Sequence, residues 1–222
     1  MGGDGVKKPK LILLPRHKYA DVPSDDPLRL YYWPILGRFY RRRVELCLAE
    51  CRGGHRVLEV GCGAGASFLN LHMSYQEIYG LDLTMRLEEV SSTFENINIP
   101  VHLKNGNILQ MPYGDDYFDT VLAISVLEHL KPAEQSQAFA EIHRVLKPGG
   151  QVVYGVPMAR PFMTFMFHLL GHVLHFDIED HHFSTEKDVS AAAGDSLQLV
   201  RLQRMTTLLG PVYEVGHFLK KA

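Results

Sequence analysis

Three glycines, Gly61, Gly63 and Gly65, alternate with small residues directly after the apolar run VLEV, and Glu59 precedes the first of them by two positions. Glycine permits a tight turn and lets a ligand approach the backbone closely. The spacing also fits the permissive form of a dinucleotide-binding turn, so the glycines alone do not select a ligand. No Lys-Ser or Lys-Thr pair follows them, which excludes a P-loop.

Two carboxylates accompany this loop. Asp82 ends the next apolar run, 17 residues after Gly65, where a carboxylate can accept hydrogen bonds from both hydroxyls of a ribose. Glu59 is more selective, because a carboxylate beside the loop repels a pyrophosphate and attracts an ammonium or sulfonium group. Together they predict an adenosine cofactor with positive charge near the loop. The simpler alternatives are that Glu59 pairs with a helix N-terminus and that Asp82 only closes a turn.

Short β-branched runs alternate with segments of helical spacing, of which 133–146 is the clearest. The predicted strands are 56–60, 78–82, 101–104, 118–124, 151–156, 197–205 and 212–221. This alternation predicts an α/β fold with a doubly wound, parallel sheet that helices cover on both faces. The last two strands are too close in sequence for a crossover helix, so we expect them to be antiparallel. Ligands of such sheets bind at the carboxyl ends of the strands.

The stretches VLEVGCGAG, GLD, LEHL and RVLKPGG, taken together, resemble the class I S-adenosylmethionine-dependent methyltransferases from about Arg56 to Val156. The resemblance implies a Rossmann-like, doubly wound, seven-stranded sheet that is mostly parallel with an antiparallel last strand. It also implies S-adenosyl-L-methionine as the cofactor, S-adenosyl-L-homocysteine as its product, and methyl transfer to a small molecule.

By the same resemblance, Glu59, Gly61 and Gly63 would line the methionine moiety and Asp82 would hold the ribose. Asn107 stands where the family often has an acidic residue near the adenine, although Asn in NGN is also ordinary turn chemistry. Ile108 would pack on the purine, and Ser125 would approach the cofactor from below. The full set of expected cofactor-binding residues is Glu59, Gly61, Cys62, Gly63, Gly65, Asp82, Leu83, Asn107, Ile108 and Ser125.

Methyl transfer needs a general base only if the acceptor must lose a proton. His129, which follows the fourth strand, and His181 and His182 are the catalytic candidates, because imidazole titrates near neutrality. Glu128 and His129 could equally cap the helix that follows them. No metal site is predicted, because the histidines at 168, 172 and 175 suit the wet edge of an apolar helix.

Two segments rich in aromatic residues and Met, 31–40 and 157–183, occupy positions where the family usually builds its lid. A pocket lined in this way suits an apolar or aromatic acceptor such as a lipid, a quinone or a secondary metabolite. A plain core helix is an equally good interpretation of 161–176. Contact of that stretch with a membrane surface is an alternative that we do not expect.

The 222 residues suit one methyltransferase domain, predicted over 29–222, with 1–28 as a flexible N-terminal arm and 157–183 as a helical lid insertion. The net charge of −2 argues against a nucleic-acid partner. The arginines at 38 and 41–43 are expected on a solvated helix face, with binding of an anionic substrate as the alternative. Cys47, Cys51 and Cys62 lack zinc-type spacing, which predicts reduced thiols and a cytoplasmic location.

Two functions of other classes stay open on the sequence. A non-catalytic partner or sensor protein could bind S-adenosylmethionine through the same motifs, because these motifs report binding rather than turnover. An NAD-dependent oxidoreductase would explain the glycines and Asp82. It would, however, place Glu59 beside a pyrophosphate, and it would leave only 66 residues after Val156 for a substrate domain.

Overall fold

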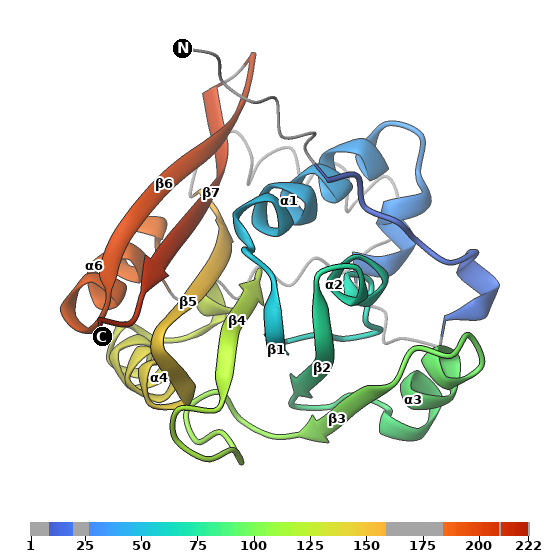
Figure 1. The fold of residues 1–222 in the computed structure, drawn as a ribbon. Coiled ribbons are helices and arrows are strands. Elements are labelled where there is room, and N and C mark those ends of the chain that lie inside the picture. The colour runs from blue at the N-terminus through green and yellow to red at the C-terminus, as the bar shows by residue number, and fades with distance from the viewer. Residues whose placement is uncertain (1–8, 20–26, 159–183, 209, 222) are drawn as a thin grey trace, which may run out of the picture.

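Figure 1 shows a computed structural model of the chain, which describes residues 9–19, 27–158, 184–208 and 210–221. Within them a seven-stranded sheet has the order β3-β2-β1-β4-β5-β7-β6. Its strands are β1 (Gly54–Val60), β2 (Tyr75–Asp82), β3 (Val101–Asn105), β4 (Phe118–Ile124), β5 (Leu146–Pro157), β6 (Gln198–Thr207) and β7 (Gly210–Leu219). All seven predicted strands are confirmed.

The direction of the strands also agrees with the prediction. β1 runs parallel to β2 and β4, β2 to β3, and β4 to β5, whereas β7 lies antiparallel between β5 and β6. The chain winds outward from β1 to β3 and then returns to β4 on the other side of β1. The carboxyl ends of β1 and β4 are therefore the point where the strand order reverses, which is the usual position of a ligand in such sheets.

Helices cover both faces of the sheet, as predicted (Figure 1). One face carries α1 (Leu36–Glu50), α2 (Phe68–His72) and α3 (Leu87–Glu95), and the other carries α4 (Pro132–Val145) and α6 (Glu186–Ser196). Successive strand residues point to opposite faces. In β4, Leu122 therefore belongs to the core beneath α1 to α3, and Val121 and Ala123 belong to the core beneath α4 and α6.

β5 begins five residues earlier than the sequence predicts. Leu146 already pairs with Phe118, and the register then shifts so that Gln151 pairs with Thr120. Residues 147–150 form the extra length between these pairs, and Gly149 there has φ of +75°. The prediction treated KPGG as a break between helix and strand, whereas it is an irregularity inside the strand.

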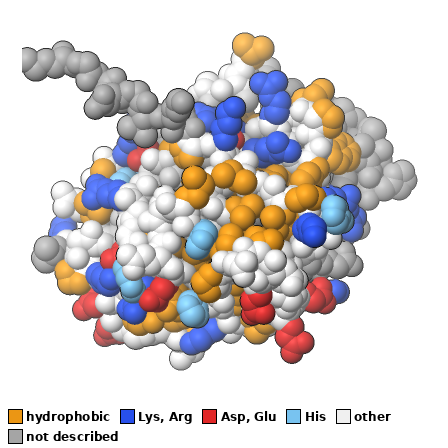
Figure 2. Space-filling view, turned by 45° about the vertical axis from the view of Figure 1, so that its right-hand side comes forward, with side chains coloured by type: hydrophobic (Ala, Val, Ile, Leu, Met, Phe, Trp, Pro, Cys, Tyr) orange, Lys and Arg blue, Asp and Glu red, His pale blue; other side chains and the backbone are white. Residues whose placement is uncertain are grey.

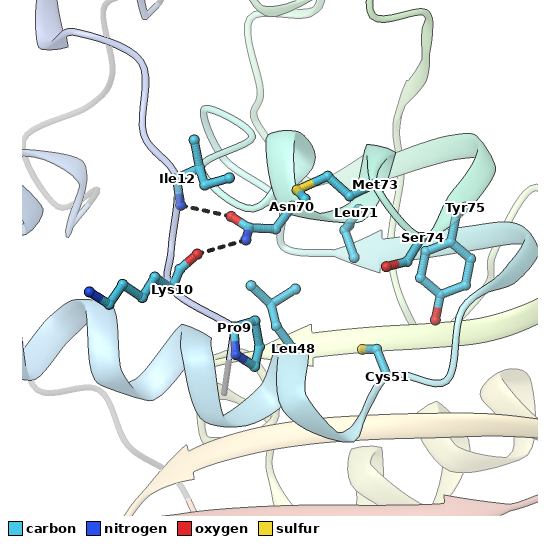
Figure 3. A pocket seen from close by; sticks show the side chains of 10 residues that line it. All are labelled: Pro9, Lys10, Ile12, Leu48, Cys51, Asn70, Leu71, Met73, Ser74 and Tyr75. Atoms are coloured by element: carbon cyan, nitrogen blue, oxygen red, sulfur yellow. Dashed lines mark hydrogen bonds between the residues drawn. The ribbon is translucent and has the colours of Figure 1, made fainter. Parts of the chain in front are cut away.

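The described part of the N-terminal segment, residues 9–19, lies against α1 and α2. Asn70 of α2 accepts a hydrogen bond from Ile12 N–H (2.9 Å) and donates one to the Lys10 carbonyl (2.9 Å), as Figure 3 shows. Leu11 N–H donates to Glu45 of α1, and the Leu11 side chain is buried. The segment borders a small pocket at the start of β2. That pocket lies at the opposite strand ends from the glycine loop.

The described surface mixes both signs of charge. On the face in Figure 2, apolar side chains gather near the centre, and basic and acidic side chains both occur around them. Among the described helices, none has the length and apolar character needed to cross a membrane.

Candidate functional site

The glycine loop follows β1 and depends on glycine for two reasons. Gly61, Gly63 and Gly65 have φ of +66°, +48° and +73°, in the left-handed region that L residues with side chains seldom adopt. A Cβ on Gly61 would also lie 2.3 Å from Cγ2 of Val126, the second residue after β4. The backbone of the loop therefore packs closely against the segment after β4. Cys62 is buried in the loop, with its Sγ 3.7 Å from Sδ of Met85.

Glu59 lies in the interior, next to last in β1, and is only 5% exposed. Its carboxylate accepts a hydrogen bond from the Ser67 hydroxyl, at the start of α2. Burial raises the pKa of Glu59 to about 8, the hydrogen bond from Ser67 lowers it, and the charge of Asp82 raises it. An acid with this pKa is ready to be ionised by a positive ligand, because the ligand's charge favours the carboxylate form.

Asp82 ends β2 and ties the glycine loop in place. Its Oδ2 accepts a hydrogen bond from Gly63 N–H (3.0 Å), and its Oδ1 accepts one from Thr84 N–H (3.1 Å). Each carboxylate oxygen can accept a second hydrogen bond, so the group can still bind a pair of hydroxyls. The next residue, Leu83, is 68% exposed, so the chain presents an apolar side chain to solvent at the end of β2.

The loop after β3 lies beside Asp82, because Gly106 N–H donates a hydrogen bond to the Asp82 carbonyl (2.8 Å). Asn107 is exposed, and its Oδ1 accepts a hydrogen bond from Leu109 N–H (2.9 Å), which is the turn chemistry named as the alternative to adenine binding. Ile108 is buried in the core beneath α4. The loop therefore offers its backbone and the Asn107 amide group, rather than the Ile108 side chain, to the surface.

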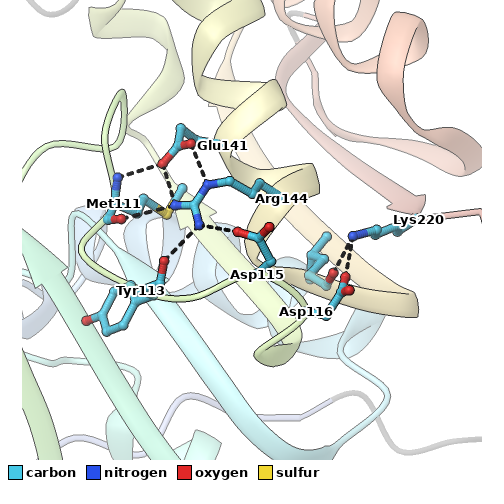
Figure 4. A network of polar contacts seen from close by, with 8 residues as sticks. Met111, Tyr113, Asp115, Asp116, Glu141, Arg144 and Lys220 are labelled. Atoms are coloured by element: carbon cyan, nitrogen blue, oxygen red, sulfur yellow. Dashed lines mark hydrogen bonds and ion pairs between the residues drawn. The ribbon is translucent and has the colours of Figure 1, made fainter.

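A network around Arg144 of α4 fixes the rest of this loop, as Figure 4 shows. The guanidinium donates to both carboxylate oxygens of Glu141, to Asp115, and to the carbonyls of Met111 and Tyr113, all at 2.7–3.1 Å. Glu141 in turn accepts a hydrogen bond from Met111 N–H (2.8 Å). Arg144 lowers the pKa of Glu141, as expected for a forked ion pair.

The segment after β4 leaves Ser125 partly exposed, buries Glu128 and exposes His129. Ser125 has φ of +55°, and its N–H donates to the Gly155 carbonyl (2.7 Å). In the 3-10 turn η3 (Leu127–His129), Glu128 is 2% exposed, whereas His129 is exposed. Burial raises the pKa of Glu128 to about 8, although its own backbone N–H and Arg43 act against this. The sequence placed both Glu128 and His129 where the acceptor should meet the methyl group, with helix capping as the alternative, and it named only His129 as a catalytic candidate.

Arg43 of α1 corrects one prediction. It was expected on a solvated helix face, but its guanidinium carbon lies 4.1 Å from the ring centroid of Tyr40 and 5.3 Å from that of Tyr213. The cause is that α1 packs on the sheet along the stripe that contains Tyr40, Arg43 and Cys47. This i, i+3, i+7 spacing was the signal in the sequence that would have revealed it.

The carboxyl ends of β1, β2, β3 and β4 thus carry nine of the predicted residues, namely Glu59, Gly61, Cys62, Gly63, Gly65, Asp82, Leu83, Asn107 and Ser125. His181 and His182, the histidines at 168, 172 and 175, and the predicted lid from 159 onward lie outside the described residues. Among the described residues, no cluster of three or more His, Cys, Asp or Glu side chains could hold a metal ion.

Known proteins share both the sequence and the fold. Residues 58–154 match a family model described as a methyltransferase domain. An uncharacterized methyltransferase, YcgJ of Bacillus subtilis, is 36% identical over 105 residues, which cover 46% of this chain and 41% of YcgJ. A demethylmenaquinone methyltransferase of Lactiplantibacillus plantarum is 34% identical over 122 residues, which cover 52% of this chain and 50% of that protein. The matched part of the chain thus spans half or less of the length of these relatives.

A solved structure gives the same fold over nearly the whole chain. The N-methyltransferase NodS from Bradyrhizobium japonicum, in complex with S-adenosyl-L-homocysteine, superposes with a TM-score of 0.66 at 20% identity, covering 89% of this chain and 93% of NodS. This likeness shows that the two proteins share a fold, and the family match over residues 58–154 indicates a methyltransferase domain in that part of the chain.

Proposed function

We propose that this chain transfers a methyl group from S-adenosylmethionine to a small, apolar or aromatic acceptor. The observation that carries the proposal is the buried Glu59 beside a glycine loop that Asp82 holds in place. These residues fit the cofactor. The loop backbone at Gly61 packs too closely for a Cβ, Glu59 complements the positive end of the ligand, and Asp82 complements the ribose.

When bound, S-adenosylmethionine would supply a methyl group on a positive sulfur with a neutral leaving group. The part of the chain is to align the reacting atoms in line and to exclude water. Glu59 would hold the positive end, Asp82 the ribose, and Leu83 and the Asn107 amide group would border the adenine. Ser125 would stand below the methionine moiety.

Aromatic side chains close to the end of β4 support an aromatic or apolar acceptor. Phe39, Tyr40 and Tyr213 gather around Arg43 beside Ser125. Among the relatives, one is named for a quinone precursor, and another is named as an O-methyltransferase of Penicillium expansum. The proposal extends the small-molecule class of these relatives to this chain, with the predicted lid at 157–183 completing the acceptor pocket.

A proton acceptor is required only for acceptors that release a proton in the reaction. His129, His181 and His182 remain our candidates from the sequence. The structure adds Glu128 as a fourth candidate, because its buried carboxyl group stands three residues after Ser125. With a pKa of about 8 this group becomes an effective base as the pH rises toward 8.

The three cysteines are free thiols, which supports our proposal of a reducing, cytoplasmic location.

Calorimetric titration with S-adenosylhomocysteine, S-adenosylmethionine and NAD tests the cofactor. We expect the first two to bind and NAD not to bind. Asp82→Ala should abolish binding, and Asp82→Asn, which keeps an acceptor for Gly63 N–H, should weaken it while preserving the loop. Asp116→Ala is the matched control, because it removes an exposed carboxylate that pairs with Lys220 far along the chain. Binding of NAD alone would overturn the proposal.

Turnover separates the enzyme from a non-catalytic binding protein. Labelled S-adenosylmethionine would be offered with a panel of quinols, phenols and apolar amines, and methylated product would be sought by mass spectrometry. Product with any acceptor, lost in Asp82→Ala, supports the enzyme. Cofactor binding without product across the panel would favour the sensor or partner alternative.

A further inference from the structure

The N-terminal segment 9–19 is held on α2 by an amide side chain. Asn70 accepts a hydrogen bond from Ile12 N–H (2.9 Å) and donates one to the Lys10 carbonyl (2.9 Å), as Figure 3 shows. We call these two hydrogen bonds the Asn70 clamp. Asn70 is only 9% exposed, so a shorter side chain there would leave backbone groups of the segment without this partner.

α2 depends on such contacts for its position, because it is short. It has only five residues, Phe68–His72, and a helix of that length is not stable by itself in water. Asn70 N–H donates to the Ser67 carbonyl (2.9 Å), and the Ser67 hydroxyl donates to the Glu59 carboxylate. The Asn70 clamp therefore lies about one helical turn from the hydrogen bond between Ser67 and Glu59.

A chain of aromatic contacts joins the other end of the segment to the glycine loop. Tyr19 is buried and packs edge-on against Phe94 of α3, with ring centroids 6.5 Å apart. Phe94 packs in turn against Phe68, at 5.1 Å between centroids. Both phenyl rings border the loop, because a Cβ on Gly65 would lie 2.5 Å from Phe68 and 2.8 Å from Phe94. The contacts of Tyr19 thus end on the backbone of the loop.

The segment is also anchored on elements away from α2. Leu11 N–H donates to Glu45 of α1 (3.1 Å). The Leu14 carbonyl accepts a hydrogen bond from the hydroxyl of Tyr32, which ends the 3-10 helix η2 (Pro27–Tyr32). The segment therefore connects α1 and η2 to the helices that border the glycine loop, and it can act as a fixed support.

We infer that segment 9–19 braces the cofactor-binding glycine loop through two positioning residues, Asn70 and Tyr19. Asn70 holds the end that carries Ser67, and Tyr19 supports the backbone at Gly65. The inference rests on the proposed function, because it adds supports to the same site, and neither positioning residue is assigned a contact with the cofactor. A loop already in its binding geometry loses less conformational freedom when the ligand arrives. Without the brace, only a fraction of the molecules holds that geometry, and the apparent affinity falls by this fraction.

Substitutions on both sides of the Asn70 clamp test its effect on binding. Ile12→Pro removes the N–H that donates to Asn70, and Asn70→Ala removes the amide group itself. We expect each to weaken binding of S-adenosylhomocysteine about fivefold or more in calorimetry. Ile12→Ala is the matched control, because it keeps the N–H and shortens a side chain that is 45% exposed, and it should bind like the natural protein. Tyr19→Leu, which removes the ring contact with Phe94, repeats the test at the other end and carries it if Asn70→Ala does not fold.

Two readouts separate positioning from a general loss of stability. Amide hydrogen exchange of the unliganded protein should become faster at residues 63–71 in Ile12→Pro and Asn70→Ala, and it should stay unchanged in β4 and β5. The hydrogen bond from Ser67 lowers the pKa of Glu59, so its loss raises that pKa, and the rise of affinity for S-adenosylmethionine with pH should move to higher pH. The further titratable groups near Glu59 in the described chain, namely Asp82, Cys47 and Cys51, stay in place in these variants.

Natural affinity and natural exchange at residues 63–71 in both clamp variants would overturn the inference. Weaker binding with faster exchange throughout the sheet would overturn it as well, because the segment would then support the whole fold rather than the loop. If the natural protein binds neither ligand, the proposed function fails, whereas the exchange measurement needs no ligand and still tests the brace.

Discussion

The buried carboxyl group of Glu59 should make cofactor binding depend on pH. Its pKa of about 8 arises mainly from burial, is lowered by Ser67 and is raised by Asp82. At pH 6 about 1% of such groups is ionised, and at pH 8 about half. A ligand that requires the carboxylate therefore gains up to about 50-fold in affinity as the pH rises from 6 to 8.

The same reasoning predicts how many protons leave on binding. At pH 7, binding of S-adenosylmethionine should release close to one proton from Glu59, because the positive ligand favours the ionised form. Titration calorimetry in two buffers of different ionisation enthalpy measures this number. S-adenosylhomocysteine, whose sulfur is neutral, should release fewer protons.

Glu59→Gln removes the titrating group and keeps an acceptor for the Ser67 hydroxyl. We expect weaker binding of S-adenosylmethionine and no linked proton release. Glu214→Gln is a control, because Glu214 is equally buried but lies in β7, paired with Arg204. Proton release of the same size in Glu59→Gln, or an affinity that is flat between pH 6 and 8 in the natural protein, would refute the reasoning.

Three further predictions follow from the site and its supports. Gly61→Ala places a Cβ against Val126 at a position with φ of +66°, so it should lower the free energy of unfolding by about 2 kcal/mol and abolish cofactor binding. Gly149→Ala has φ of +75° but open space around its Cβ, so it should cost about 1 kcal/mol and leave cofactor binding intact. Calorimetry measures cofactor binding and urea unfolding measures stability in both glycine variants. Equal loss of cofactor binding in the two would contradict the clash between residue 61 and Val126. Arg144→Leu, which loses five hydrogen bonds, should lower the free energy of unfolding by about 2 kcal/mol and weaken binding of adenosine ligands; an unchanged Tm would argue against it. Glu128 and Glu59 both bind their protons more tightly when folded, so the natural protein should lose stability as pH rises from about 4.5 to about 8. Glu128→Gln should lose less stability than the natural protein between pH 5 and 8 in urea unfolding, with Glu59 supplying the remaining loss; an equal loss in both proteins would exclude a contribution from Glu128.

The sequence predicts the sheet well because its signals are local and repeated. Each β-branched run is short, and the segments between the first five strands are long enough for parallel crossovers, three of which contain a helix (α2, α3 and α4). The positions of Glu59 and Asp82 follow from this, since both stand near the ends of strands that must align. The early start of β5 was missed, because Leu146 follows α4 without a break and Gly149 resembles a terminator.

Side-chain direction is where sequence reasoning fails. Arg43 belongs to a stripe with Tyr40 and Cys47, but a charged residue on a helix is assigned to solvent unless its packing partners are known. Glu128 and His129 differ by one position in a 3-10 turn, which is too short to show any periodicity. Only the packing of η3 against β5 and α6 decides that the acid faces inward.

The place of β7 in the sheet bears on how the chain is made. β7 is the last of the seven strands to leave the ribosome, yet it lies between β5 and β6 and pairs with both. Until it is synthesised, one edge of β5 has no partner and β6 has no place in the sheet. A nascent chain stalled before residue 210 therefore exposes an open strand edge, the kind of surface that aggregates or recruits chaperones. Removing β7 should accordingly prevent folding rather than yield a shorter folded domain.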